Sequence, residues 1–459
     1  MKNVFRRSFA AMALLACVLP GSAQEFRSSY FSKMSKFNHQ MNPALIDENY
    51  GAFLLGQVSA TATGNVGLGN FVYEVNDIEG EDYVSFMSNR IDKNTFLSDL
   101  EAENEFNVYL NYNIFSAVFD RWGGSNLVEL NLRSSANAVV PYEFFKFAKE
   151  EGVENEYHMK DLNFTTQNYF ELALGHARNI NEKLRVGAKV KLLVGAAYAD
   201  FKVNNLELVK QPSLYKWSVK GDVRLNAALM DCPPAYDEDY ISDGRKRIDG
   251  FDDIKPGISG FGLAADLGAT YQLTEDLTLS AGITDLGFIK WQGVHTASSA
   301  GEYEFDGFKH SSAAASGSLD NGSLEDLQKD LEDLFAIYDD GEKDINETLA
   351  ATVNAGAEYT MPFYRKMSVG VLYTGRFHGD YSWHQGMVSA NVRPLNWLEV
   401  NANASMTSTG FAMGGLVNFK LGGVGLYVGS DQLIGSLPSE ILTAKDANSQ
   451  LTFGMTISL

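Results

Sequence analysis

The side chains best suited to catalysis or metal binding are scattered along this 459-residue chain. Its seven histidines form no cluster, and His378 and His384 flank one segment without a cysteine or carboxylate to complete a zinc site. The chain contains no G-x-S-x-G nucleophile elbow and no phosphate-binding loop, and nothing marks a nucleophile for a Ser/His/Asp set assembled from distant loops. The sequence therefore predicts no enzyme, no catalytic residue, no metal site and no cofactor.

A long acidic stretch, residues 292–347, offers two further interpretations. Its Asp339, Asp340, Glu342 and Asp344 carry the oxygen atoms that calcium prefers, but their spacing matches no EF-hand loop. Apolar residues recur at helical spacing between Ser323 and Tyr338, which predicts a short helix in a long loop. That helix either packs on the rest of the protein or forms a docking surface for a partner.

Charged side chains also recur at every second position within apolar stretches. In residues 184–192, Val186 and Val190 alternate with Lys189 and Lys191. Such alternation indicates β-strands with one apolar and one charged face. A soluble sandwich would bury the apolar face, whereas a membrane barrel would turn it to lipid and the charged face to a lumen. The candidate lumen-facing residues are Glu129, Arg133, Glu171, Arg185, Lys189, Lys191 and Glu399.

Fourteen alternating segments can be counted, and the lengths of their connections favour a barrel. The segments are 53–62, 105–119, 126–139, the two arms of 169–192, 260–272, 277–291, five that begin near residues 348, 367, 386, 398 and 410, and finally 423–430 and 450–459. Short connections alternate with long ones, with 408–409 as the exception, as periplasmic turns and outer loops do in outer-membrane barrels. We expect an all-β fold: a transmembrane antiparallel β-barrel of about fourteen strands, spanning residues 51–459. Residues 213–229 also alternate, and we place them in an external hairpin.

The N-terminus carries an export signal. Basic residues precede an apolar stretch and small residues stand before Gln24, which predicts a signal peptide over residues 1–23; the alternative is lipidation at Cys17. After cleavage only Cys232 would remain, so no internal disulfide is expected. The formal net charge of −21 argues against nucleic acid and anionic membrane surfaces as partners.

Residues 24–50 show no strand alternation but are rich in large apolar side chains. Phe26, Tyr30, Phe31 and Phe37 favour burial, and Pro43 biases the preceding Asn42 toward an extended conformation. We expect this segment to occupy the periplasmic half of the lumen as a hatch, with Asn42, Pro43 and Ala44 leading toward the first strand. The alternative is a free periplasmic tail.

Several motifs carry a family resemblance, among them F-R-S-S-Y-F at 26–31, H-Q-M-N-P-A at 39–44, P-Y-E-F-F-K-F at 141–147, D-L-G-A-T-Y at 266–271 and D-L-G-F-I-K-W at 285–291. Together they resemble an uncharacterised family of Bacteroidota outer-membrane proteins, a domain of unknown function. The N-terminal Asn-Pro-Ala is also similar to that of the long-chain fatty-acid transporters of the outer membrane. That resemblance implies fourteen strands and an N-terminal hatch in the lumen, although the charged lumen departs from a fatty-acid channel.

Three functions follow as expectations. The first is an outer-membrane barrel that binds or passes a small hydrophobic or amphipathic ligand. The second is a non-transporting barrel that docks partners in a secretion, motility or surface assembly. The third is a soluble secreted all-β module. For either barrel the expected partners are outer-membrane lipid and the barrel-insertion machinery, since the hydrophobic final strand resembles the signal that this machinery reads.

Overall fold

The computed structural model describes residues 25–46, 51–74, 83–150, 153–211, 216–230, 232–251, 255, 257–307, 329–379, 382–407, 410–434 and 449–457. The predicted signal peptide, Cys17 and the beginning of the predicted 323–338 helix lie outside these residues. Within them, no helix is long and apolar enough to cross a membrane.

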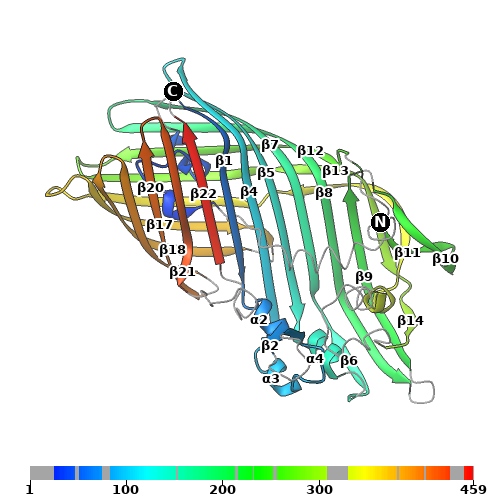
Figure 1. Ribbon diagram of the computed structural model, residues 1–459. Coiled ribbons are helices and arrows are strands. Elements are labelled where there is room, and N and C mark those ends of the chain that lie inside the picture. The colour runs from blue at the N-terminus through cyan, green and yellow to red at the C-terminus, as the bar shows by residue number, and fades with distance from the viewer. Residues whose placement is uncertain are drawn as a thin grey trace.

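Fourteen antiparallel strands form a closed ring (Figure 1). Each strand pairs with the ring strands before and after it along the chain, and the C-terminal strand pairs with the N-terminal strand to close the ring. The fourteen-stranded β-barrel predicted from the sequence is thus confirmed. Its strands are β1 (Gly51–Gly64), β4 (Glu103–Arg121), β5 (Gly124–Pro141), β7 (Leu162–Asn179), β8 (Leu184–Gln211), β12 (Gly260–Gln272), β13 (Leu277–Ser299), β16 (Ala351–Thr360), β17 (Met367–Phe377), β18 (Trp383–Leu395), β19 (Leu398–Thr407), β20 (Gly410–Leu421), β21 (Val424–Ile434) and β22 (Ser449–Ile457).

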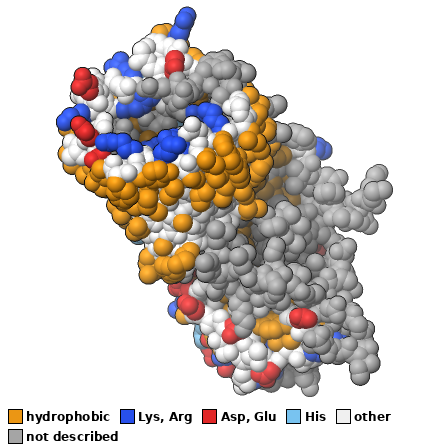
Figure 2. Space-filling model, turned by 60° about the vertical axis from the view of Figure 1, so that its left-hand side comes forward, with side chains coloured by type: hydrophobic (Ala, Val, Ile, Leu, Met, Phe, Trp, Pro, Cys, Tyr) orange, Lys and Arg blue, Asp and Glu red, His pale blue; other side chains and the backbone are white. Residues whose placement is uncertain are grey.

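The two faces of the ring differ in polarity because alternate side chains leave each strand in opposite directions. On β8, Val190 is 63% exposed whereas the flanking Lys189 and Lys191 are buried. The same contrast recurs at Leu451 beside Thr452 on β22, and at Val388 beside Ser389 on β18. Figure 2 shows the outward side chains as a broad hydrophobic band, below an end of the barrel that carries charged residues.

Two ring strands continue beyond this band and build an extension with shorter strands. The far half of β8 pairs with β9 (Lys216–Leu229), and the far half of β13 pairs with β9 and with β15 (Ile337–Thr348). The part of the 213–229 prediction that is described therefore forms an external hairpin, as expected. The other strands of the extension are β6 (Glu156–Met159), β10 (Pro234–Ser242), β11 (Arg245–Phe251) and β14 (Glu302–Phe305).

Protein rather than solvent covers the outward face of this extension. Phe201, Val223 and Leu225 are buried in a hydrophobic core that also contains Phe147 of α4 (Tyr142–Glu150) and Leu334. Next to it, α2 (Leu68–Phe71), α3 (Lys93–Leu97) and the small sheet of β2 (Val72–Glu74) and β3 (Tyr83–Ser85) enclose an aromatic cluster.

The predicted helix at 323–338 is only partly correct. Residues 329–334 are helical, and Leu334 packs into the core of the extension. Tyr338, however, belongs to strand β15, where it pairs with Arg247 and Ser298. The backbone of Tyr338 is paired with a strand on each side, so tertiary context overrides the local helical spacing.

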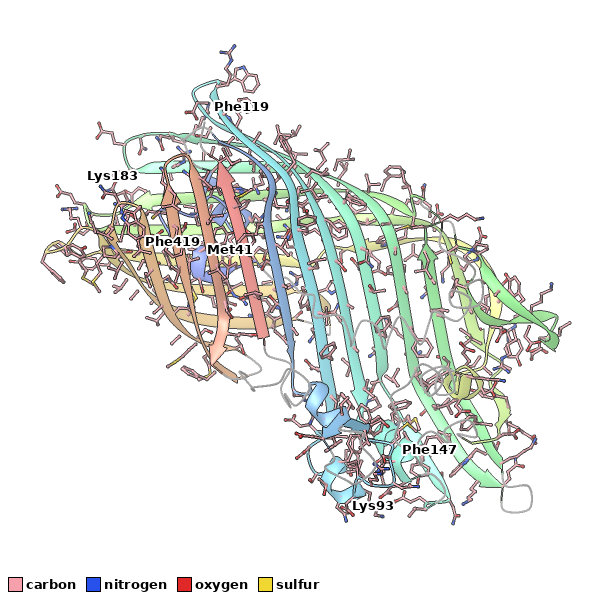
Figure 3. All side chains as sticks on the ribbon, viewed as in Figure 1. Met41, Lys93, Phe119, Phe147, Lys183 and Phe419 are labelled. Atoms are coloured by element: carbon pink, nitrogen blue, oxygen red, sulfur yellow. The ribbon has the colours of Figure 1, made fainter. Side chains whose placement is uncertain are left out.

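The two ends of the barrel are built differently. The short turns, near the labelled Phe119, Lys183 and Phe419, gather at one end, whereas the helices near Lys93 and Phe147 lie at the other (Figure 3). Inside the ring, near the end with the short turns, lie three single-turn 3-10 helices: η1 (Arg27–Ser29), η2 (Asn38–Gln40) and η3 (Pro43–Leu45).

Candidate functional site: the lumen and the N-terminal segment

Residues 25–46, here called the N-terminal segment, are enclosed by the ring. Phe26 stacks on Tyr427 of β21, and Phe31 packs with Leu372 of β17 and Met387 of β18. On another side of the ring, Ile46 packs against Leu127 of β5. Contacts with strands around the whole ring place the segment in the lumen, where Figure 3 shows the labelled Met41.

Glycines in the wall make room for the segment's backbone. Gly187, Gly268 and Gly282 are cross-strand neighbours on β8, β12 and β13. A Cβ at Gly268 would overlap the Asn42 side chain, one at Gly187 would overlap the backbone of Pro43, and one at Gly282 would meet the Met41 carbonyl. The chain therefore crosses these three strands at a row without side chains, as close backbone approach requires.

The Asn-Pro-Ala motif forms the turn that follows this crossing. The Asn42 side chain accepts a hydrogen bond from Ala44 N (3.0 Å) and donates one to the carbonyl of Ala269 on β12 (3.3 Å). Pro43 occupies the first position of η3, where its missing N–H costs no hydrogen bond. The three residues thus cap a turn and attach it to the wall.

Two inward carboxylates bind the segment's free backbone N–H groups. Glu399 of β19 accepts hydrogen bonds from Ser32 Oγ (2.6 Å), Lys33 N (3.0 Å) and Met34 N (3.0 Å). Asp431 of β21 accepts from Arg27 N (2.8 Å) and Ser28 N (2.7 Å), and its carboxylate also pairs with the Arg27 guanidinium. Bonds to an ionised acceptor are stronger than neutral ones, so these carboxylates hold the first half of the segment.

A buried ion pair holds the middle of the segment. Lys189 Nζ lies 2.7 Å from Glu129 Oε1 and 3.0 Å from His39 Nδ1, and all three side chains are buried. A charge taken out of water needs a partner, because removing one member of a buried pair typically costs about 3–5 kcal/mol. The pair therefore links β5 to β8 in the wall, and through His39 it also fixes the position of η2.

A larger cluster of charges lies farther from the short turns. Lys191 Nζ contacts Asp285 (2.6 Å), Asp266 (2.9 Å) and Glu171 (3.5 Å). The positive φ of Asp285 (60°) accompanies a hydrogen bond from its N–H to Asp266 Oδ1 (2.8 Å), which brings the two carboxylates to one lysine.

The same cluster extends to the segment through Arg133. Its guanidinium lies 3.5 Å from Glu171 and 3.2 Å from Glu25, the first described residue. Glu25 is buried, so its carboxylate depends on this pairing in place of water.

The seven candidate lumen residues all have inward, paired side chains, but they do not form one site. Arg133, Lys189 and Glu399 contact the segment directly, and Arg185 donates to the carbonyls of Ala44 (2.9 Å) and Ile46 (2.8 Å). The others, Glu129, Glu171 and Lys191, are linked to it through their partners. That any of the seven acts on a ligand stays a prediction.

Sequence reasoning missed five carboxylates of this network: Glu25, Asp266, Asp285, Asp431 and Glu358, which pairs with Lys33 of the segment. Asp266 shares the inward face of β12 with Ala264 and Gly268, so the alternation within the predicted 260–272 strand marks it. Asp431 carried no such signal, because the predicted last long loop began at that residue.

The loop carboxylates considered for calcium have separate partners. Asp340 pairs with Arg245 (2.7 Å), Asp344 with Lys290 (2.8 Å), and Asp339 accepts from Tyr236 (2.8 Å). Among the described residues, the group spaced for a metal ion is Glu156, His158 and the partly buried Glu207, in which Glu156 already contacts His158 (2.8 Å).

The extension also carries polar side chains. A cavity of about 410 Å³ lies between β9, β13 and β15, lined by polar side chains that include Asp222, Arg224, Asn226, Ser298 and Lys343. Its lining carries both signs of charge. The arrangement can hold polar groups and water, and it offers no nucleophile held by a base.

Comparison with known proteins identifies the family. The model of a family of unknown function, DUF5723, matches residues 43–431. The chain belongs to this family. The Bacteroidota origin suggested by the sequence motifs stays a prediction, and no curated protein matches the chain.

Among solved structures, the chain is similar to outer-membrane barrels. The toluene transporter TodX of Pseudomonas putida is 10% identical, with 92% of this chain and 93% of that chain covered and a TM-score of 0.41. A FadL homologue from Pseudomonas aeruginosa is 12% identical over the same shares, also with a TM-score of 0.41. The translocator domain of the autotransporter NalP from Neisseria meningitidis is 9% identical, with 89% and 88% covered and a TM-score of 0.31. At these scores the likeness carries no argument about ligands.

Proposed function

We propose that this DUF5723 protein is an outer-membrane β-barrel, exported through a cleaved signal peptide, whose lumen is closed by its own N-terminal segment. In this proposal it binds a small ligand and passes it when the segment moves. The ligand carries polar groups, and an amphipathic molecule fits better than a purely hydrophobic one, because the inward side chains are largely polar or charged.

The hydrophobic band supports insertion into a membrane. On β7 the outward Phe170 and Leu174 are 40% and 57% exposed, whereas Phe164, farther along the same face, packs against the core of the extension. Contiguous exposed apolar surface around a ring is unfavourable in water and favourable against lipid. The lipid-facing band would end where the outward side chains of the strands become covered by the core of the extension.

The observation that carries the gating role is how the segment is attached. Where its backbone bonds to the wall, it bonds to wall side chains, such as Glu399, Asp431 and Arg185, and it is not paired into the sheet. Side-chain contacts of this kind can be exchanged for water or ligand without opening the ring. A segment fixed by strand pairing could not leave in this way.

The test removes the segment. Residues 25–41 are deleted while residues 1–24 are kept, and the purified barrel is placed in liposomes for swelling assays with small sugars. Faster swelling than the parent is expected, because the deletion removes the side chains that fill the lumen. A deletion of equal length at 311–327 is the control, and it should leave swelling unchanged.

Two results would contradict the proposal. If the barrel without residues 25–41 inserts normally and swelling does not increase, its wall side chains close the lumen, which favours the non-transporting, partner-docking barrel. If neither the parent nor the control enters the membrane fraction, the soluble module stands instead.

A further inference from the structure

A small cavity lies in the lumen on the far side of the Glu25–Arg133 pair from the short turns. Its volume of about 40 Å³ exceeds the roughly 10–15 Å³ that one water molecule needs. The side chains that line it and carry the argument are Tyr109 of β4, Arg133 and Asn137 of β5, Gln167 of β7 and Arg376 of β17. The lining also includes the carboxylate of Asp285, which is already paired with Lys191. A carboxylate group fits a space of this size.

Arg376 is the unusual residue of this cavity. It has no ion pair or hydrogen bond among the described residues, and its guanidinium lies 5.0 Å from the ring centre of Tyr109. Six ring strands separate β17 from β4 in either direction, so Arg376 reaches across the lumen. A guanidinium stacked on an aromatic ring keeps its edge N–H groups free, in the fork that matches a carboxylate.

Two further side chains of the lining lack partners although they are buried. Gln167 is 6% exposed and its Nε2 makes no hydrogen bond, and Asn137 is 3% exposed and its Oδ1 makes none. Buried polar atoms are nearly always paired, so two orphans beside a cavity point to something that binds there. Gln167 supplies a second donor for an anion, and the Asn137 amide can turn its NH₂ toward one.

The segment itself already places a carboxylate at the edge of this cavity. Glu25 Oε1 lies 3.2 Å from Arg133 Nη1. An anion bound between Arg376 and Arg133 would compete with Glu25 for the same guanidinium. Binding would therefore weaken the contact that anchors the beginning of the segment.

We infer that this cavity is a binding site for the carboxylate group of a small organic anion, with Arg376 as its main ligand-binding side chain. This inference rests on the proposed function and names the ligand class of the same lumen. Occupation of the site displaces Glu25 from Arg133, so ligand binding and release of the segment are coupled.

The experiment is calorimetric titration of the folded, detergent-solubilised full-length mature barrel with succinate. Succinamide, which has the same shape without the charge, is the ligand control. We expect millimolar or tighter binding of succinate, at least tenfold weaker binding to Arg376→Gln, and no detectable binding of succinamide. Arg365→Gln is the matched control, because Arg365 lies in a turn outside the lumen and pairs with Asp276; it should bind like the parent.

A second variant tests the competition. Glu25→Gln removes the carboxylate that competes at Arg133 Nη1 and leaves Glu171 on Arg133 Nε, so the variant should bind succinate several-fold more tightly than the parent. If Arg376→Gln does not fold, Gln167→Ala replaces it, with binding expected to weaken about threefold. The inference is overturned if the parent does not bind succinate, if succinamide binds equally well, or if loss of Arg376 leaves binding unchanged. Because titration requires no passage, its failure leaves the swelling result intact, and failed swelling leaves the site intact.

Discussion

Adjacent residues on each strand of this barrel face two different environments, the lumen and the outer surface. Lys189 and Val190 are adjacent, yet Lys189 is buried against Glu129 whereas Val190 is among the most exposed of the described apolar residues. The charge inside is stabilised by its partner, and the valine outside by lipid if the protein is inserted as proposed. Replacement of the inward charge by an apolar side chain, or of the outward valine by a charged one, should therefore destabilise the inserted protein.

At this scale we predict that Val190→Arg impairs membrane insertion. An arginine near the bilayer midplane costs about 2–4 kcal/mol, so the fraction of protein that reaches the folded, heat-modifiable form in vesicles should drop. Val209→Arg is a matched control: Val209 lies on the same strand and is 40% exposed, but it belongs to the extension beyond the band. Equal insertion of both variants would contradict the assigned lipid-facing surface.

Among the elements, the N-terminal segment is shaped by the wall as much as by its own sequence. It has no strand partners, and its turns are single 3-10 helices that would not be stable alone. The glycine row on β8, β12 and β13 and the carboxylates Glu399 and Asp431 supply what it lacks: space for its backbone and acceptors for its N–H groups.

The corresponding prediction is that Gly268→Ala loosens the segment without disrupting the ring. The added methyl group would overlap the Asn42 side chain, so the segment must shift. Trypsin should then cut faster at Arg27, Lys33 or Lys36 in folded protein, as followed by mass spectrometry. Gly386→Ala, where a Cβ would meet open space, should be cut like the parent. Identical cleavage of all three proteins would show that the glycine row does not position the segment.

The molecule as a whole is asymmetric along its axis. One end consists of short turns, whereas the other carries the extension, its hydrophobic core and the helices α2, α3 and α4. Barrels of the outer membrane carry their short turns on the periplasmic side. The N-terminal segment lies near the end with the short turns (Figure 1), which faces the periplasm if the barrel is inserted as proposed.

This orientation predicts opposite labelling of two epitope tags. A tag inserted within residues 311–320 should bind antibody on intact cells, because this stretch of sequence connects β14 and β15, two strands of the extension. A tag between Asn396 and Trp397, in the turn that joins β18 to β19, should be labelled only after the outer membrane is permeabilised. Labelling of permeabilised cells checks that both tagged proteins are made. The reverse pattern on intact cells would overturn the orientation.

The sequence alone was sufficient for the ring and for the direction in which its side chains point. Alternation is a local property with a period of two residues, so Lys189 and Val190 could be assigned to opposite faces without any knowledge of neighbouring strands. The lengths of the connections distinguished the two ends of the barrel, because the number of residues between two predicted strands can be counted without knowledge of strand pairing. Tyr338 was assigned wrongly because a helical spacing of apolar residues is also compatible with a strand that buries part of its surface.

Only the tertiary structure decided which inward residues meet. Lys189 and Glu129 are 60 positions apart, Lys191 and Asp285 are 94 apart, and Ser32 and Glu399 are 367 apart. Their contacts depend on strand register, on the bulges that shift it and on ring closure, none of which leaves a local pattern. The cavity beside Arg376 has the same origin, because it exists only where β17 and β4 face each other across the lumen.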